Sequence, residues 1–163
     1  MERMVRTEYF QTGTVVECLE SKDKFNAIRE LLKKAPVVAA FKDACLIEEA
    51  AIEREKVYTT GIGRGVAIAH GKTPCVADTI ILLGISKKGI DFQSADGQLV
   101  HLLFLIANPP DKSEEYLLAL STLARLMRQN DFAASLSETL SACQVERLMC
   151  DQFKALLQGR ADN

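Results

Sequence analysis

The sequence lacks any excess of basic charge: its 163 residues contain 20 Lys and Arg against 22 Asp and Glu, for a formal net charge of −2. Nucleic-acid-binding proteins take most of their non-specific affinity from a basic surface, so binding to DNA or RNA is not expected. No apolar run approaches the roughly 20 residues that cross a bilayer, and no apolar segment of a secretory signal follows residues 1–6. We therefore expect one compact domain in the cytoplasm, without membrane insertion.

The sequence also lacks paired cysteines and is poor in histidine. Its five cysteines are spread singly along the chain, as Cys18, Cys45, Cys75, Cys143 and Cys150. Without a C-x-x-C pair they indicate neither a disulfide framework nor a zinc site, and we interpret them as small buried hydrophobic residues. The only histidines are His70 and His101, which excludes an all-histidine metal cluster. No metal or other cofactor is expected.

Hydrophobic periodicity outlines alternating helices and strands, with no linker or internal repeat between them. The pattern predicts a short strand at 15–19, a helix from Ser21 or Asp23 to Pro36, a helix at 41–56, a loop at 59–65, a strand at 66–69 closed by His70, strands at 79–85 and 99–107 ended by Pro109-Pro110, a helix from Ser113 and two further helices. The last helix has a capping box, Ser141 and Gln144, and Gly159 as its stop. The two later strands are almost continuously apolar, as in sheets covered on both faces. We therefore predict an α/β domain with helices on both faces of the sheet.

The densest group of chemistry-bearing residues runs from Arg54 to Lys72 and includes Gly61, Gly63, Gly65 and His70. Alternating glycines let a backbone bend sharply and can turn its amides toward an anion. One interpretation is therefore an anion pocket beside a nucleophile. The other is a glycine-rich turn between a helix and a strand, with His70 capping the strand, and composition and spacing leave both open.

Two nucleotide-binding motifs fail in this segment. A G-x-G-x-x-G fingerprint needs glycine at 66 or 68, where the chain has Val66 and Ile68. The end of a P-loop is imitated by residues 71–73, but Gly65 stands one residue out of register for it. Neither a dinucleotide site nor a P-loop ATP site is expected.

His70 suits nucleophilic catalysis because an ordinary histidine pKa of about 6.5 leaves much of the imidazole neutral near pH 7. A ring nitrogen can then attack phosphorus and later pass the phosphoryl group on, if nearby donors neutralise its charge. Arg54 can supply a bidentate guanidinium, and Thr60 with the loop amides the remaining donors. Taken alone, a histidine at the end of a strand is also compatible with a purely structural role.

Three segments resemble the type-2 enzyme IIA domains of the phosphoenolpyruvate-dependent sugar phosphotransferase system, the fructose/mannitol/nitrogen-regulatory class. They are Arg54-Glu55-Lys56 with residues 59–63 and 65–72, the D-G-x-x-V strand segment at 96–109, and the following helix at 116–126. The resemblance covers about residues 12–155. It leaves an N-terminal extension at 1–11 and a C-terminal tail at 156–163.

The resemblance implies a mixed β-sheet sandwiched between helices in three layers, with His70 as the phosphorylated histidine. It implies an HPr-like phosphocarrier protein as the donor and, in sugar-transporting members, a cysteine of a IIB domain as the acceptor. Arg54 matches the family arginine beside the phosphohistidine. Together with the loop donors, this gives an expected phosphate-binding set of Thr60, Gly61, Gly63, Gly65 and Gly71.

The chain departs from the family pattern at two positions. Ala69 replaces the usual proline before the active histidine, and we expect this to loosen how the imidazole is presented. Tyr116 stands where many members have a second active-site histidine. Tyr116 can donate a hydrogen bond to a phosphoryl group but cannot carry positive charge. His101 is not expected to replace that histidine, since it lies in a strand on the same face as Leu103 and Leu105.

The favoured function is a phosphocarrier, a free-standing regulatory protein of the nitrogen-related branch that accepts phosphate on His70 and passes it on or signals by its phosphorylation state. The alternative is a non-catalytic sensor that keeps the fold and binds a regulatory target or a IIB domain without relaying phosphate. An unrelated α/β enzyme would need an acid/base pair, and the chain offers only Glu53 and Glu55, which we interpret as a solvated face.

Overall fold

The computed structural model describes residues 9–136, 138 and 140–161. In chain order the elements are β1 (Val15–Val16), α1 (Lys24–Lys34), the 3-10 helix η1 (Pro36–Ala40), α2 (Cys45–Val57), β2 (Gly61–Gly63), β3 (Val66–Lys72), β4 (Ile80–Ile90), β5 (Val100–Asn108), α3 (Ser113–Met127), α4 (Asn130–Leu136) and α5 (Ala142–Ala161).

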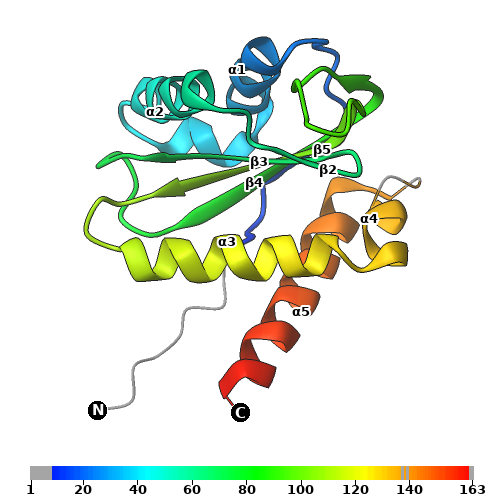
Figure 1. Cartoon of the computed structure of the whole chain (residues 1–163). Coiled ribbons are helices and arrows are strands. Elements are labelled where there is room, and N and C mark those ends of the chain that lie inside the picture. The colour runs from blue at the N-terminus through cyan, green and yellow to red at the C-terminus, as the bar shows by residue number, and fades with distance from the viewer. Residues whose placement is uncertain (1–8, 137, 139, 162–163) are drawn as a thin grey trace.

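The strands form one mixed sheet in the order β1-β4-β5-β3-β2. β1 runs parallel to β4 and β3 runs parallel to β5, whereas β4 with β5 and β2 with β3 are antiparallel. Figure 1 shows α1 and α2 on one face of this sheet and α3, α4 and α5 on the other. The predicted α/β fold, a mixed sheet sandwiched between helices in three layers, is confirmed.

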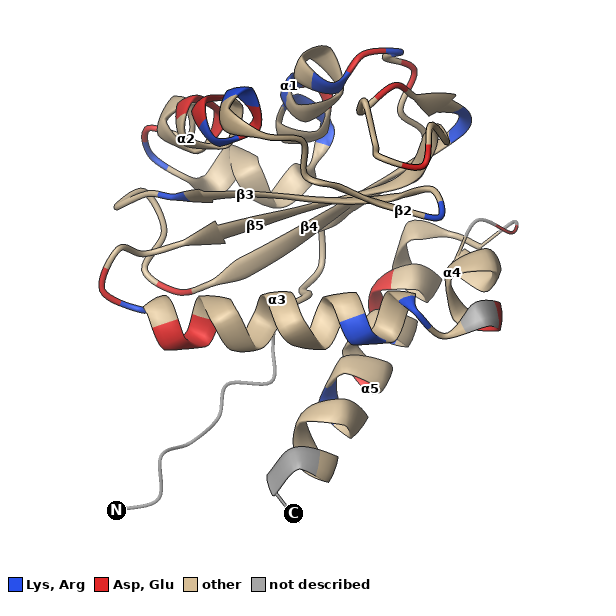
Figure 2. Cartoon of the chain, in the orientation of Figure 1, with Lys and Arg blue, Asp and Glu red and all other residues tan. Residues whose placement is uncertain are grey.

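The alternation of β3 decides which way its residues face. Ala67 and Ala69 belong to the hydrophobic core under α1 and α2, whereas Val66 and Ile68 belong to the core under α3 and α5. His70 continues the second series, because residues two apart in a strand share a face. Lys, Arg, Asp and Glu lie mainly on helices and turns, and the middle of the sheet is almost free of them (Figure 2). His70 is therefore one of few polar groups on the α3 side of the sheet.

Several boundaries lie where the sequence places them. α1 ends at Lys34, just before Pro36, and β5 ends at Asn108, just before Pro109. The capping box of α5 is present, since the Ser141 amide donates to Gln144 Oε1 at 2.8 Å and the Gln144 amide donates to Ser141 Oγ at 3.2 Å. The two ends predicted from proline and the predicted capping box are therefore confirmed.

Other boundaries differ from the prediction. α2 begins at Cys45 and not at 41, because Asp43 adopts a left-handed φ of 59° that interrupts a helix. The predicted loop at 59–65 contains the short strand β2, which pairs with β3. α5 continues past Gly159 to Ala161. A side chain at Gly159 would meet nothing within 4 Å, so no turn or close contact requires a glycine there.

The prediction that the cysteines are buried is wrong. Cys18, Cys45 and Cys143 are exposed, Cys75 and Cys150 are partly buried, and all five are free thiols. Cysteine is often buried, but that preference does not fix the exposure of a given residue.

The described chain begins inside the fold. Tyr9 and Phe10 are buried, and their rings pack on Phe153 of α5 at centroid distances of 5.1 and 5.8 Å. Within the described residues, none of the helices has the length and apolar character needed to cross a membrane.

Candidate functional site

His70 lies near the C-terminal end of β3 and is half-buried against α3. Its ring is tilted by 47° to the ring of Tyr116, with 5.2 Å between the centroids. His70 Nδ1 lies 3.4 Å from the carbonyl oxygen of Ile68. A carbonyl can only accept, so this contact favours the tautomer with the proton on Nδ1. Nε2 is then left with a free lone pair, as a nucleophile requires.

The surroundings of His70 keep its imidazole neutral. Burial is the largest cause of a lowered His70 pKa, and the positive charges of Arg54 and Lys72 act in the same direction. The Ile68 carbonyl and the negative charge of Glu55 act against them, but the pKa remains below the ordinary value of 6.5. The neutral form therefore dominates near pH 7, and only that form can attack an electrophile.

Arg54 brings a cation to this end of β3 from the last turn of α2. Its Nη1 donates to the carbonyl of Tyr58 at 3.0 Å, which satisfies a carbonyl just beyond the helix end. The charge of Arg54 influences both the His70 pKa and the Tyr116 pKa. A guanidinium has five N–H donors, so donors remain for a bound anion.

Tyr116 faces His70 from the first turns of α3. Its pKa is raised above the ordinary value of 10, with burial as the main cause and Arg54 opposing it. The phenol is therefore protonated at physiological pH and can donate a hydrogen bond. The predicted position of Tyr116, near the start of the helix that follows β5, is confirmed.

Glu55 was missed by sequence reasoning. It was interpreted as part of a solvated face, but it is 1% exposed. Both of its carboxylate oxygens accept from the Thr60 amide, at 3.2 and 3.1 Å, and the Thr60 hydroxyl also donates to it. Lys24 of α1 lies 3.3 Å from Glu55 Oε1. Glu53, in contrast, is exposed and pairs with Lys56 at 2.9 Å. Glu55 therefore ties the end of α2 to β2 and to α1.

Glu55 is hard to recognise from sequence alone. It lies beside Arg54 in the same polar cluster as Glu53, and side-chain periodicity alone does not separate the two carboxylates. Lys24, its ionic partner, is 31 positions earlier in the chain. No local pattern indicates that pairing.

Four of the predicted phosphate-binding residues are engaged in other contacts or lie away from His70. The hydroxyl and the amide of Thr60 are already bonded to Glu55, and the Gly61 amide donates to Thr59 Oγ1 at 3.1 Å. Gly63 pairs with Val66, and Gly65 closes the same turn. Both glycines thus lie at the opposite end of β3 from His70.

Gly71 and His101 also serve other purposes than the predicted site. A Cβ at Gly71 would approach Ala50 Cβ to 2.7 Å, so Gly71 lets α2 pack closely on β3. His101 is the second residue of β5, and its Nδ1 lies 2.8 Å from the Ser86 carbonyl oxygen. The interpretation of His101 as a residue apart from the His70 site agrees with this geometry, because His70 pairs with Ile106 of β5.

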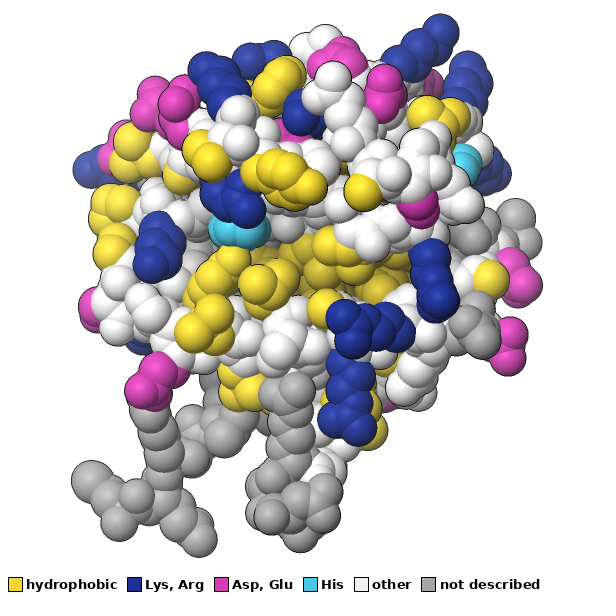
Figure 3. Space-filling view, viewed as in Figure 1, with side chains coloured by type: hydrophobic (Ala, Val, Ile, Leu, Met, Phe, Trp, Pro, Cys, Tyr) yellow, Lys and Arg dark blue, Asp and Glu magenta, His cyan; other side chains and the backbone are white. Residues whose placement is uncertain are grey.

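Exposed hydrophobic residues accompany both sides of the site. Val57 and Tyr58, which follow Arg54, are 80% and 69% exposed, and Leu117, which follows Tyr116, is 60% exposed. Figure 3 shows a hydrophobic hollow between the sheet and α3, with a histidine on its rim. Among the described residues, no group of His, Cys, Asp and Glu is arranged to hold a metal ion.

Comparison with known proteins identifies the family. The family described as "Phosphoenolpyruvate-dependent sugar phosphotransferase system, EIIA 2" matches residues 8–150. The chain belongs to this family. As an EIIA type-2 member it is a component of a phosphotransferase system, as the resemblance predicted.

Two curated relatives show how this EIIA fold is used in other chains. The nitrogen regulatory protein of Bradyrhizobium diazoefficiens is 35% identical over 136 residues, which cover 83% of this chain and 88% of that protein. The fructose-specific EIIABC component of Bacillus subtilis is 37% identical over 135 residues, which again cover 83% of this chain. This chain spans only 21% of that longer relative.

Solved structures agree on the fold. The nitrogen regulatory protein IIA-Ntr of Neisseria meningitidis is 26% identical, with a TM-score of 0.78 and coverage of 88% of this chain and 97% of that one. Enzyme IIA-mannitol of Escherichia coli, solved in complex with phosphorylated enzyme IIB-mannitol, matches with a TM-score of 0.70 at 19% identity, covering 86% of this chain and 96% of that one. At 19% identity, the second likeness shows a shared fold.

Proposed function

We propose that this EIIA protein accepts a phosphoryl group on Nε2 of His70 from an HPr-like phosphocarrier protein. Nε2 attacks the phosphorus of a phosphohistidine on the donor, and the new N–P bond forms as the donor's N–P bond breaks. The donor imidazole takes the electron pair of the broken bond. Each imidazole keeps the proton on its other ring nitrogen, so no net proton transfer is needed. The observation that carries the proposal is a half-buried, neutral histidine beside Arg54 and Tyr116.

Arg54 and Tyr116 have different roles in this proposal. Arg54 neutralises part of the charge on the phosphoryl group through its unused N–H donors. Tyr116 donates one neutral hydrogen bond from the opposite side. Thr60, Gly61, Gly63, Gly65 and Gly71 are left out of the phosphate-binding set, because their donors or their positions serve the contacts described above.

The exposed hydrophobic residues beside the site are proposed to contact the donor protein. Leu117 follows Tyr116 directly, and Val57 and Tyr58 lie within four positions of Arg54. A protein donor must bring its own imidazole close to His70, and burial of apolar side chains around that point would stabilise the encounter. A relay of this kind would operate in the cytoplasm.

The acceptor side of the proposal is regulatory. The Bradyrhizobium relative that this chain nearly spans is named a nitrogen regulatory protein. This name supports a role in which a target protein binds differently to the phosphorylated and the unphosphorylated forms. Transfer to a cysteine of a IIB domain, the route that the resemblance implies for sugar-transporting family members, is the other possibility. We favour the regulatory role for this chain.

One observation favours a second candidate function, a non-catalytic partner-binding sensor. Tyr116 supplies a neutral hydroxyl where many family members have a histidine, so the site has less positive charge for a phosphoryl group. A sensor of this kind would bind the same partners through Val57, Tyr58 and Leu117 but would not become phosphorylated.

The two functions are separated by incubation with enzyme I, HPr and phosphoenolpyruvate, followed by intact mass under alkaline conditions that preserve phosphohistidine. The phosphocarrier function predicts a gain of one phosphoryl group in the wild type and in His101→Gln, and none in His70→Gln. His101→Gln is the matched control, because it removes the other histidine of the chain. No mass gain in the wild type, with HPr itself phosphorylated, would contradict the phosphocarrier and support the sensor.

A further inference from the structure

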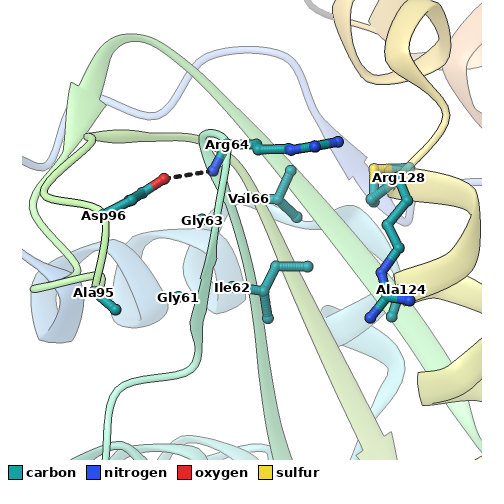
Figure 4. Close-up of a pocket in the computed structure, with 10 residues that line it drawn as sticks. Gly61, Ile62, Gly63, Arg64, Val66, Ala95, Asp96, Ala124 and Arg128 are labelled. Atoms are coloured by element: carbon teal, nitrogen blue, oxygen red, sulfur yellow. Dashed lines mark hydrogen bonds between the residues drawn. The ribbon is translucent and has the colours of Figure 1, made fainter.

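A cavity of about 610 Å³ opens at the other end of β3 from His70. Its walls come from the β2–β3 turn, the segment before β5 and the C-terminal end of α3 (Figure 4). Val66 lines it, and His70 is four positions further along the same strand, a separation of roughly 13 Å. Its volume lies within the range of small-molecule sites. The phosphotransfer proposal does not use this cavity.

Two exposed arginine side chains, Arg64 and Arg128, line the cavity. Arg64 comes from the β2–β3 turn and Arg128 from the end of α3, and in Figure 4 the side chain of Arg64 extends toward the side where Arg128 lies. Within the described part of the chain, neither side chain makes a hydrogen bond or an ion pair. Two cations on the walls of one cavity make it electropositive and favour a bound anion.

Asp96 is the acidic residue of this cavity, and its oxygens are already engaged by the backbone. Oδ2 accepts from the Arg64 amide at 2.9 Å, and Oδ1 accepts from the Gln98 amide at 3.1 Å. These backbone hydrogen bonds hold the Asp96 pKa below its ordinary value. Asp96 therefore fixes the turn that presents Arg64 and leaves the guanidinium free.

The backbone at Arg64 is constrained. Gly63, Arg64 and Gly65 have φ values of 89°, 57° and 79°. A residue with a Cβ in the left-handed region is uncommon and costs free energy, so Arg64 needs a compensating contact. The hydrogen bond from the Arg64 amide to Asp96 stabilises the conformation, and the exposed side chain points into the cavity region.

The rest of the lining is apolar. Ile62 and Val66 come from the hairpin, and Ala124 and Met127 come from α3. Ile62 is 51% exposed, so it offers apolar surface that a ligand in the cavity can cover. The cavity thus combines an apolar floor with a cationic end, and an amphipathic anion complements both.

We propose that this cavity binds a small phosphate monoester that carries an apolar body. A phosphate dianion offers three terminal oxygens and nearly two negative charges, enough to accept from two guanidinium groups on different elements. The apolar body would cover Ile62 and Met127. The site would let the protein respond to a metabolite independently of phosphorylation at His70.

Calorimetric titration with phenyl phosphate tests this proposal. We expect saturable binding of one equivalent, with affinity reduced about tenfold or more in Arg64→Ala and in Arg128→Ala, because each loses a charge-assisted contact. Arg125→Ala is the matched control: Arg125 lies in the same last turn of α3 but does not line the cavity, and its affinity should stay within about twofold of the wild type. Higher salt should weaken binding.

Three further titrations test which parts of phenyl phosphate are recognised and whether His70 takes part in binding. Inorganic phosphate and benzyl alcohol should each bind more weakly than phenyl phosphate, because the first lacks the apolar ring and the second lacks the phosphate group. His70→Gln should bind phenyl phosphate like the wild type. The proposal is overturned by absence of saturation, by equal affinity in the Arg64, Arg128 and Arg125 variants, or by loss of binding in His70→Gln. Unchanged thermal melting of each variant would show that its fold is intact. Because none of these measurements involves phosphotransfer, their failure would leave the phosphocarrier proposal standing.

Discussion

The two ends of β3 handle charge in opposite ways. At the His70 end, Glu55 is buried and its oxygens are occupied by Thr60 and Lys24, while Arg54 is hydrogen bonded to the Tyr58 carbonyl. At the turn end, Arg64 and Arg128 are unpaired among the described residues. Charges that have hydrogen-bond or ionic partners within the protein can act on a fixed group such as His70. Charges left unpaired on a cavity wall are suited to a group that arrives from solution.

Removal of Glu55 should produce the largest change in stability. Glu55→Ala leaves Lys24 and the Thr60 donors without their buried acceptor, so we expect the free energy of unfolding to fall by about 3 kcal/mol. Urea denaturation measures this. Asp96→Ala at the turn end should have a smaller effect, because Asp96 is exposed. If the Asp96 variant loses as much stability as the Glu55 variant, the contrast between the two ends is wrong.

Loss of Arg54 should affect chemistry more than folding. Arg54→Ala removes the cation proposed to hold the phosphoryl group, and we expect the rate of phosphorylation by HPr to fall about a hundredfold. Arg125→Ala, an exposed arginine in α3, should react at the wild-type rate. Rapid quenching followed by intact mass gives both rates. Equal phosphorylation rates for the Arg54 variant and the wild type would show that phosphorylation of His70 does not depend on the Arg54 charge.

The smallest expected effect is a pH dependence of stability that comes from His70. Its pKa is lower in the folded protein, so between that value and about 6.5 the unfolded chain binds more protons. Stability from this group is therefore fully present above about pH 6.5 and is lost as the pH falls through the lowered pKa. Urea midpoints at a series of pH values should show this decline in the wild type and in His101→Gln. A decline of the same size in His70→Gln would assign it to another group.

Much of the fold follows from local sequence signals, as three elements illustrate. The Ser141–Gln144 box, the proline after β5 and the apolar run of β5 act through neighbouring residues or through uniform burial, and all three lie close to where they were predicted. The strand predicted at 79–85 is also present, but β4 continues to Ile90. The start of α2 was predicted too early, because apolar spacing does not reveal the left-handed residue Asp43. A helix or strand is predictable when the residues that determine its bounds lie within a few positions of it in the sequence.

The candidate site was predictable in part. His70, Arg54 and Tyr116 were all named from sequence, and the structure places His70 beside Tyr116 with Arg54 influencing both. The loop glycines were expected beside His70 because they are close to it in sequence. β2 folds back antiparallel on β3, however, and this carries Gly63 and Gly65 to the far end of the strand. Strand pairing decides such a placement, and pairing depends on the whole sheet.

The contact between Tyr9 and Phe153 has a consequence for how this fold can be built into longer chains. Tyr9 accepts a backbone hydrogen bond from Ile81 of β4, and α5, which carries Phe153, packs against β1 at one edge of the sheet. β3 lies on the other side of β4 and β5. A polypeptide linker attached near Tyr9 or Phe153 would therefore leave His70 accessible to a partner protein. The same reactive surface can then serve in a separate protein and in a domain fused to others.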